Sequence, residues 1–254
     1  MADNETPLTL GVDIGGSGMK AAPVDLDAGA FVEERHRIST PESRKPKPMI
    51  ALVGELARHF DWHGPIGATF PGVVRDGVVG SAANLDTGWI GVDVAAAFSE
   101  STGCPVRVIN DADAAGLAEM RYGAGRGRSG TVLMLTFGTG IGSGLFRDGV
   151  LVPNTELGHV EIDGEKAESR AAASLRKSED LSWEEWTGRV ERYLRHVTWL
   201  LSPDLIIVGG GVSRKAGKWL PMIDVDTEIV PAELQNGAGI VGAALIADGM
   251  DPTS

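Results

Sequence analysis

Two stretches of the chain, LGVDIGGSGMKAAPVD at residues 10–25 and LMLTFGTGIGSGLFRD at residues 133–148, share one pattern. In each, a short apolar run leads into a glycine-rich turn and a second apolar run follows, which predicts a hairpin of two strands. The two turns lie about half of the 254-residue chain apart. The repetition indicates two similar lobes, each opened by a glycine hairpin, although chance similarity of two such hairpins is an equally simple explanation.

Around these hairpins, apolar strands alternate with helical patterns, which is the order typical of α/β folds. We expect further strands at residues 32–38, 66–70, 106–109 and 205–208, and a hairpin through Asp76 and Gly77. Apolar spacing predicts a helix at residues 48–60, and composition favours further helices at residues 92–101, 112–122, 165–177, 183–201 and 237–247. The expected lobes are residues 1–110, completed by a C-terminal helix at 237–254, and a larger lobe of residues 111–236.

Composition excludes several classes of protein. Hydrophobic residues make up 43% and charged residues 23%, so the chain is neither disordered nor fibrous. The net charge of −12 argues against broad binding to nucleic acid or to an anionic membrane. Cys104 is the single cysteine, no apolar run reaches the length of a membrane span, and the start MADNETP is unlike a signal peptide. A cytoplasmic protein with no nucleic-acid or membrane partner is expected.

The glycine turns are candidate phosphate sites. Successive backbone N–H groups of such a turn point into one concavity, where no side chain keeps an anion away. Neither turn matches GxxxxGK[ST], and each by itself is more often a plain tight turn, whereas equivalent turns in two lobes favour phosphate. Asp13 is also the candidate ligand of a hydrated Mg²⁺. The candidate phosphate-binding residues are Asp13, Gly15, Gly16, Ser17, Gly18, Lys20, Thr136, Gly138, Thr139 and Gly140.

A third glycine cluster, Gly209, Gly210 and Gly211, follows the apolar run at residues 205–208. Strand ends of this kind bind ligands in α/β proteins, and a plain turn into a helix fits equally well. Basic residues occur shortly after this cluster and in an earlier loop. They either form solvated surface or guide a long polyanion to the site. They are Arg214, Lys215 and Lys218, and Arg121, Arg126 and Arg128.

Asn110 and Asp111 stand where a predicted buried strand meets a helix. Either side chain suits a helix cap, which is the simpler interpretation. At a strand end beside the glycine hairpins, Asp111 is also a candidate general base that takes a proton from a substrate hydroxyl as it attacks phosphorus.

Acceptors suited to a sugar occur in two further strings. Carboxylates and amides bind the hydroxyl donors of a sugar ring. ELGHVEIDGEKAE supplies Glu156, His159 and Glu168, and SAANLDTGW supplies Asn84 and Asp86 with Trp89 nearby. Each string is also compatible with an ordinary turn.

Taken together, these strings resemble the ROK family of sugar kinases and repressors, within the actin-like superfamily. The matching strings keep the family's order and spacing over nearly the whole chain. They are DIGGSGMK (13–20), NDADAAGLAE (110–119), TFGTGIGSG (136–144), ELGH (156–159) and LIIVGGGVS (205–213).

The resemblance implies an α/β fold of two RNase H-like lobes with a ligand cleft between them, and a homodimer. It implies that Asp111 is the general base. The hexose is then bound by Asn84, Asn110, Asp111, Glu156, His159 and Glu168. The donor phosphates are bound at Gly15, Gly16, Gly138, Thr139 and Gly140, and Gly209, Gly210 and Gly211 lie near the adenosine if ATP binds.

The chain departs from the family pattern at the zinc cluster, which narrows the expected function to one branch of the family. Most members carry a CxCGxxGC zinc cluster after ELGH, and this chain has IDGEKAESRAAASLRKSED instead. With Cys104 alone, a Cys₃His zinc site cannot form, so His159 is oriented without metal. The zinc-free sequence is similar to the actinobacterial branch of the family that phosphorylates glucose from inorganic polyphosphate, some members of which also use ATP and mannose.

The expected reaction is therefore phosphoryl transfer from polyphosphate to the 6-hydroxyl of glucose, with Mg²⁺ and no zinc. The alternatives are an ATP-dependent hexokinase acting on glucose, mannose, fructose or an amino sugar, and a sugar-sensing repressor. Repressors of the family carry a helix-turn-helix ahead of the first glycine hairpin. Only twelve residues precede Asp13 and the chain is acidic, so a kinase is expected.

Overall fold

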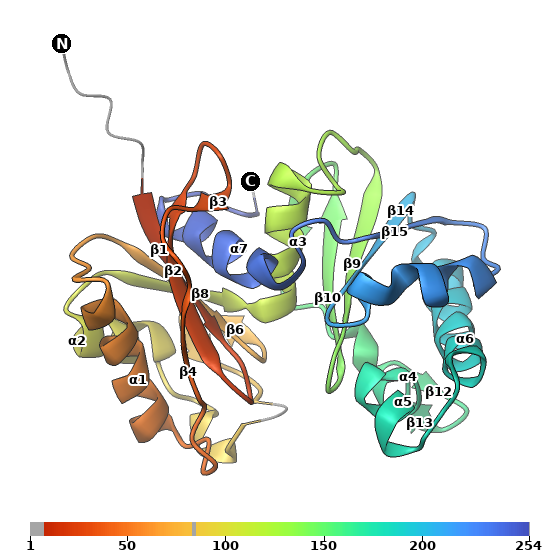
Figure 1. The fold of residues 1–254 in the computed structure, drawn as a ribbon, viewed down its shortest axis with the longest axis horizontal. Coiled ribbons are helices and arrows are strands. Elements are labelled where there is room, and N and C mark those ends of the chain that lie inside the picture. The colour runs from red at the N-terminus through yellow and green to blue at the C-terminus, as the bar shows by residue number, and fades with distance from the viewer. Residues whose placement is uncertain (1–7, 83–84, 254) are drawn as a thin grey trace. The chain divides into compact units, whose positions relative to one another are not determined.

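The computed structural model describes residues 8–82 and 85–253 and divides the chain into two compact units. Unit 1 comprises Met1–Ala118 and Gly237–Pro252, and unit 2 is chiefly Glu119–Asn236. The division falls inside helix α3 (Asp111–Tyr122), whereas the sequence predicts it at residues 110/111, where that helix begins. An uninterrupted helix therefore continues from the first unit into the second (Figure 1).

The described part of unit 1 contains a six-stranded sheet, three complete α-helices and the first part of α3. Its strands are β1 (Leu8–Ile14), β2 (Met19–Asp25), β3 (Ala30–Phe31), β4 (His36–Ile38), β5 (Ile66–Phe70) and β8 (Val106–Asn110), with a separate hairpin of β6 (Val74–Arg75) and β7 (Val78–Val79). Its helices are α1 (Pro46–His59), α2 (Val94–Thr102), the first part of α3 and α7 (Ala238–Ala247), with the short 3₁₀ helix η1 (Thr87–Trp89). The expected turn through Asp76 and Gly77 is confirmed, with φ of 51° and 80°.

Unit 2 is built around a five-stranded sheet. Its strands are β9 (Thr131–Phe137), β10 (Ile141–Arg147), β11 (Val150–Val152), β14 (Leu205–Gly209) and β15 (Glu228–Pro231), with a separate hairpin of β12 (Glu161–Ile162) and β13 (Glu165–Lys166). Its helices are α4 (Glu168–Ala171), α5 (Ala173–Ser178) and α6 (Trp183–Leu201), with the 3₁₀ helices η2 (Leu157–His159), η3 (Ser213–Lys218), η4 (Leu220–Met222) and η5 (Gln235–Gly237).

The two sheets have the same strand order. It is β3-β2-β1-β5-β8 in unit 1, with β4 beside β2, and β11-β10-β9-β14-β15 in unit 2. In each sheet the first hairpin is antiparallel, and its first strand then pairs in parallel with a later strand: β1 with β5, and β9 with β14. The repeated sequence pattern is thus a repeated topology, and each glycine turn connects the central strand of its sheet to the antiparallel neighbour.

The central strands are apolar because both of their faces are covered. In unit 1, α1 and α2 cover one face of the sheet and α7 covers the other, with the first part of α3 packed against α7 (Figure 1). Helix α7 packs so closely that a Cβ at Gly67 of β5 would stand 1.7 Å from the Ala243 carbonyl oxygen, so only glycine fits there. In unit 2, α6 buries Trp186, Val190 and Leu194 against the sheet.

Two predicted elements were wrong in detail. Of the strand expected at residues 32–38, only the last three residues form a strand, β4, while β3 ends just before that range; β3 and β4 pair with opposite ends of β2. The helix expected at residues 165–177 is interrupted at Ala172, whose ψ of 145° is extended. The Trp186 indole N–H donates to the Ala171 and Ala172 carbonyls at 3.1 and 3.2 Å, which stabilises the interruption.

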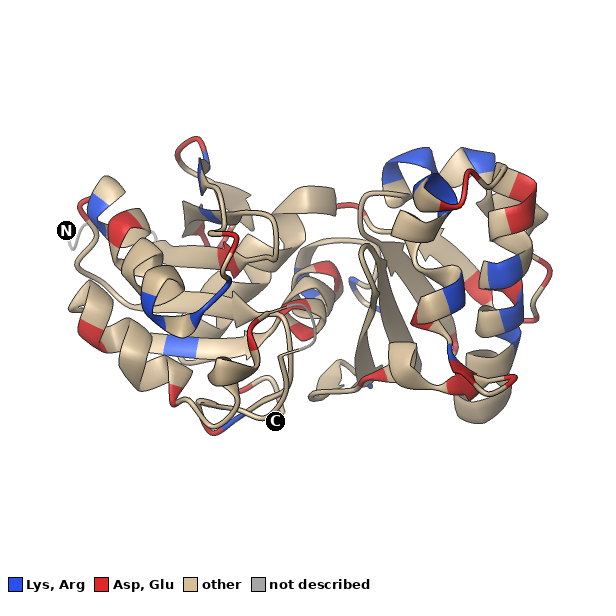
Figure 2. Cartoon of the chain, turned by 90° about the horizontal axis from the view of Figure 1, so that it is seen from below, with Lys and Arg blue, Asp and Glu red and all other residues tan. Residues whose placement is uncertain are grey.

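Acidic and basic residues both occur on each unit (Figure 2). Within the described part of the chain, no helix has the length and apolar character needed to span a membrane.

Candidate functional site

The first glycine turn, residues 15–18, connects β1 to β2, and three of its four carbonyls accept hydrogen bonds from the protein. Its backbone N–H groups at residues 16–18 have no hydrogen-bond partner among the described residues. The turn therefore keeps more donors than acceptors available. The carbonyl partners are the Thr40 hydroxyl on Gly15 (2.6 Å), the Arg37 guanidinium on Ser17 (3.1 Å) and the Gly15 N–H on Gly18 (3.1 Å).

Asp13 and Lys20 face each other across the same hairpin, because they are paired in the register of β1 and β2. The Lys20 ammonium donates to Asp13 Oδ2 at 3.0 Å, and both side chains keep between a fifth and a quarter of their surface exposed. Thr69, at the neighbouring position on β5, donates its hydroxyl to Asp13 Oδ1 at 3.3 Å and accepts from the Ile14 N–H. These contacts fix one carboxylate and one ammonium beside the turn.

The second glycine turn, residues 138–140, has the same construction. The Gly138 N–H donates to the Gly140 carbonyl at 2.9 Å. Ser174, the second residue of α5, donates its N–H to the Gly138 carbonyl and its hydroxyl to the Thr139 carbonyl, at 3.0 and 3.1 Å. The N–H groups of Thr139 and Gly140 have no hydrogen-bond partner among the residues that the structure describes.

A backbone turn with occupied carbonyls and unpaired N–H groups is suited to an anion. Its exposed dipoles all point their positive ends outward, and phosphate oxygens are strong acceptors. The second turn has this property in full and the first turn has it except at the Gly16 carbonyl, although the turns are far apart in sequence and lie in different units. The arrangement is not required by hairpin geometry alone, since the capping groups come from β4, α5 and the segment around Thr40.

The third glycine cluster lies beside the second turn. β9 and β14 run in parallel with Thr136 opposite Gly209, so their carboxyl ends meet at one edge of the sheet. Gly210, with φ of 79°, packs against the Phe137 backbone. Arg126 and Arg128 precede β9 and therefore lie at the opposite end of that strand, away from the turn.

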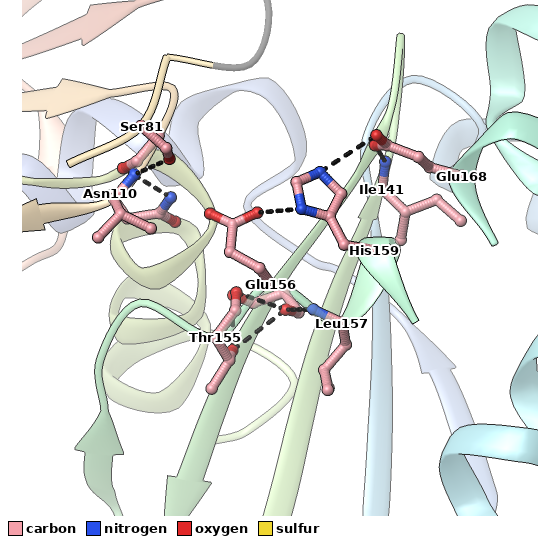
Figure 3. Close-up of polar contacts among 11 residues, drawn as sticks. Ser81, Asn110, Ile141, Thr155, Glu156, Leu157, His159 and Glu168 are labelled. Atoms are coloured by element: carbon pink, nitrogen blue, oxygen red, sulfur yellow. Dashed lines mark hydrogen bonds and ion pairs between the residues drawn. The ribbon is translucent and has the colours of Figure 1, made fainter. Parts of the chain in front are cut away.

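The side chain of Asn110 caps helix α3. Its Oδ1 accepts from the N–H groups of Ala112 and Asp113 at 2.8 and 3.0 Å, and its Nδ2 donates to the Gly72 carbonyl at 3.2 Å (Figure 3). Asp111 is the first residue of α3 and is half-buried, with Oδ1 accepting from the Ala112 N–H at 2.9 Å. The Asn110 side chain therefore provides the main cap of α3.

Unit 2 brings together three of the predicted sugar ligands. His159 Nε2 lies 3.2 Å from Glu168 Oε1, and His159 Nδ1 lies 4.0 Å from Glu156 Oε2, so a carboxylate faces each ring nitrogen (Figure 3). All three side chains remain about a quarter to a third exposed. Burial raises the pKa of Glu156, and the attraction of His159 opposes that rise.

Ser143 of β10 fastens the segment that carries Glu156 and His159. Its hydroxyl donates to the Thr155 carbonyl at 2.7 Å and accepts from the Leu157 N–H at 3.0 Å. Ser143 is buried, so these bonds are shielded from water. Glu168 also connects this group to the second glycine turn, because its Oε2 accepts from the Ile141 N–H at 3.3 Å.

The predicted residues thus form two groups. Unit 1 gathers Asp13, Lys20 and the first turn, and it also holds Asn110 and Asp111 at the end of β8. Unit 2 gathers Glu156, His159 and Glu168 with the second turn and Gly209–Gly211.

Of the sugar-binding features expected in SAANLDTGW, the aromatic face of Trp89 is wrong, and the sugar contact of Asn84 stays a prediction. Asn84 itself lies outside the described residues. Asp86 caps η1 by accepting from the Gly88 N–H at 2.8 Å. Trp89 is completely buried in the core, with its indole N–H on the Arg44 carbonyl, so it offers no aromatic face to a ligand.

The structure limits where a metal ion could bind. No group of three or more His, Cys, Asp or Glu suited to a metal occurs among residues 8–82 and 85–253. Asp13 is a single carboxylate beside a phosphate-type turn. Mg²⁺ is commonly bound through one or two carboxylates, waters and the phosphates of a substrate, so Asp13 fits a site that is completed by a donor.

Sequence reasoning missed the residues that support the site. Thr40, Thr69, Ser143 and Ser174 each bond a site residue from another element. A serine or threonine carries no distinctive sequence pattern, and its role becomes visible only when the folded chain places it beside a turn.

Residues 9–173 match the ROK family. The chain is 49% identical over 237 residues to the polyphosphate glucokinase of Mycobacterium tuberculosis strain H37Rv, covering 93% of this chain and 89% of the relative. It is similar to the crystal structure of the inorganic polyphosphate/ATP-glucomannokinase of Arthrobacter sp. strain KM, with a TM-score of 0.92, 49% identity and coverage of 95% and 98%. A ROK family glucokinase of Streptomyces griseus in complex with glucose and AMPPNP gives a TM-score of 0.78 at 25% identity, over 96% and 100% of the two chains. The chain therefore belongs to the ROK family.

Proposed function

We propose that the protein transfers a phosphoryl group from inorganic polyphosphate to the 6-hydroxyl of glucose, giving glucose 6-phosphate. The observation that carries this proposal is the shared construction of the two glycine turns, in which most carbonyls accept hydrogen bonds from the protein and the N–H groups of residues 16–18 and 139–140 have no partner among the described residues. The 49% identity to a mycobacterial polyphosphate glucokinase supports polyphosphate as the donor and glucose as the acceptor.

In the proposed reaction the protein has little covalent work to do. The sugar 6-oxygen attacks the terminal phosphorus of the donor, the bond between that phosphorus and the bridging oxygen breaks, and the donor leaves shorter by one phosphate. Asp111 accepts the proton of the 6-hydroxyl. The backbone N–H groups of the turns and the Lys20 ammonium neutralise the negative charge that develops.

Glucose is proposed to be bound by Asn84, Asn110, Asp111, Glu156, His159 and Glu168. The carboxylates beside His159 keep the imidazole ring in one orientation, which is the role that zinc has in most of the family. Both ends of the Asn110 amide already contact the backbone, and its second amide hydrogen is the one proposed to bind the sugar.

Mg²⁺ is proposed to be held by Asp13 through water, together with donor phosphates. When bound, the ion would neutralise part of the donor's charge. Residues 209–211 are proposed to lie near the adenosine when ATP is the donor.

The proposed reaction requires Asp111 of unit 1 and the second turn of unit 2 to act on one pair of substrates, as they would in two RNase H-like lobes with a ligand cleft between them. A homodimer and a cytoplasmic location are further proposals, which depend on the resemblance to the family alone.

A paired donor assay tests the function. Glucose phosphorylation is measured with long-chain polyphosphate freed of nucleotides by apyrase, and separately with ATP freed of polyphosphate by an exopolyphosphatase. We expect glucose 6-phosphate from polyphosphate, and also from ATP if the second donor of the Arthrobacter enzyme is shared.

Product from ATP alone would make the protein an ATP-dependent hexokinase of the family. No product from either donor, with glucose, mannose, fructose and glucosamine each tried, would contradict the kinase proposal and favour a sugar-sensing regulator.

A further inference from the structure

The side chain of Arg37 lies across the first glycine turn. β4 pairs with β2 so that Arg37 stands directly opposite Lys20. Its Nη2 donates to the Ser17 carbonyl at 3.1 Å. The guanidinium lies directly beside Gly18, where a Cβ would be 2.8 Å from Nε and Nη2.

Beside the first glycine turn, the positive side chains outnumber the negative ones. Like charges directly opposite on antiparallel strands destabilise a sheet, and Lys20 and Arg37 are such a pair. Asp13 forms an ion pair with Lys20. Arg37 forms no ion pair with a carboxylate within the described ranges, and its side chain is exposed. One positive charge is therefore left at the rim of a turn whose N–H groups are also unpaired.

We propose that Arg37 binds the phosphate donor at the first turn. The guanidinium carries five N–H groups in a rigid fork that matches the oxygens of a phosphate, and the bond to Ser17 uses one of them. The remaining N–H groups would bind non-bridging oxygens of a polyphosphate chain next to those bound by the turn and Lys20. The identity of the ligand as the donor rests on the proposed function, whereas the anion site itself does not.

The competing explanation is structural, since the bond to Ser17 would also hold the turn in shape. A purely structural role predicts that loss of Arg37 changes stability and leaves phosphate affinity unaltered. A binding role predicts loss of affinity for a phosphate chain in a folded protein. The two are separable because binding of a short phosphate chain is measurable without turnover.

The experiment measures the binding of inorganic tripolyphosphate to the full chain by isothermal titration calorimetry at low salt, without glucose. The variants are Arg37→Ala, Arg37→Lys and the matched control Arg35→Ala, which removes the same charge from an exposed position two residues away. We expect Arg37→Ala to weaken binding about tenfold or more, Arg37→Lys several-fold, and Arg35→Ala less than about twofold.

Thermal unfolding shows whether each variant is folded, and Arg37→Lys provides the test if Arg37→Ala is not. In the donor assay, the KM for polyphosphate should rise in Arg37→Ala while the KM for glucose stays the same. Wild-type affinity for tripolyphosphate in a folded Arg37 variant would overturn the inference, and so would a wild-type protein that binds no tripolyphosphate. If the protein binds tripolyphosphate through Arg37 and phosphorylates no sugar, the proposed function fails and this inference stands.

Discussion

At the scale of single residues, the proposed chemistry depends most on Asp111. Asn110 supplies the main cap of α3, so the carboxylate beside it is not needed for the capping that its sequence position suggested. A general base contributes about 10²–10⁴-fold to a rate. Asp111→Asn should therefore lower kcat by about that factor, with a much smaller change in glucose affinity, measured by steady-state kinetics and by glucose titration.

The matched control is Asp86→Asn, a capping carboxylate at η1 that the proposal leaves outside the reaction. Near-normal turnover in a folded Asp111→Asn protein would remove Asp111 from the role of base.

Glu156 gives the site a pH dependence. Burial raises its pKa, so it takes up a proton at a higher pH than an ordinary glutamate does. A protonated carboxyl accepts fewer sugar hydroxyls, and the KM for glucose should therefore rise as the pH falls toward the acid range. Glu156→Gln should have a higher KM at neutral pH and lose this part of the pH dependence, which a KM profile from pH 4.5 to 8 would show.

Acid unfolding caused by Glu156 does not explain the predicted rise of the KM for glucose. A carboxyl whose pKa is raised in the folded state destabilises that state at neutral pH, and this cost disappears as the pH falls through the folded pKa. Protonation of Glu156 by itself therefore increases the stability of the folded state as the pH falls. If circular dichroism showed that the protein unfolds over the range where KM rises, the pH effect could not be assigned to Glu156.

At the scale of elements, the segment of residues 168–174 holds the second turn from two sides. Glu168 accepts from Ile141, and Ser174 bonds the carbonyls of Gly138 and Thr139. The interruption of the helix at Ala172 lets the segment change direction between these contacts. This segment therefore supports the candidate donor turn through hydrogen bonds.

Ser174→Ala removes the hydroxyl bond to Thr139 and keeps the backbone bond to Gly138. A single hydrogen bond contributes about 0.5–1.5 kcal/mol, so the KM for the donor should rise about two- to tenfold with an unchanged KM for glucose. Ser178→Ala, on the exposed end of the same helix, is the control. Equal donor KM values for the two variants would show that the turn holds its shape without Ser174.

The sequence predicted the central strands and the two glycine turns between strands, because apolar runs and glycine clusters are local signals, and it missed short strands such as β11 and β15. It failed at residues 165–177, where the local pattern is helical and a distant indole, that of Trp186, favours the break. It also failed at Arg37, which reaches the first turn across a strand pair. Contacts between distant residues are outside what a local pattern records.

At the scale of the whole molecule, Glu119 connects two segments of unit 2 that are far apart in sequence. This buried carboxylate of α3 accepts from the N–H groups of Ala124, Glu233 and Leu234 at 2.8–3.1 Å. It therefore joins the end of α3 to the segment that leads back to α7. Three backbone donors would lose their acceptor if the carboxylate were absent.

Glu119→Ala should lower the free energy of unfolding by about 3 kcal/mol, because each donor left without a partner costs about 1 kcal/mol or more. Glu119→Gln should cost less, since one oxygen remains. Urea denaturation followed by circular dichroism measures both, with the exposed Glu100→Ala as the control. A loss in Glu119→Ala no larger than in Glu100→Ala would show that water replaces the carboxylate.

The most direct measurement is a crystal structure of the protein with glucose and a non-hydrolysable imido analogue of tripolyphosphate. The account predicts the sugar 6-oxygen at hydrogen-bond distance from the Asp111 carboxylate, and phosphate oxygens on the N–H groups of residues 16–18 and 139–140. A sugar or a phosphate chain bound to other residues, or a 6-oxygen out of reach of Asp111, would contradict it.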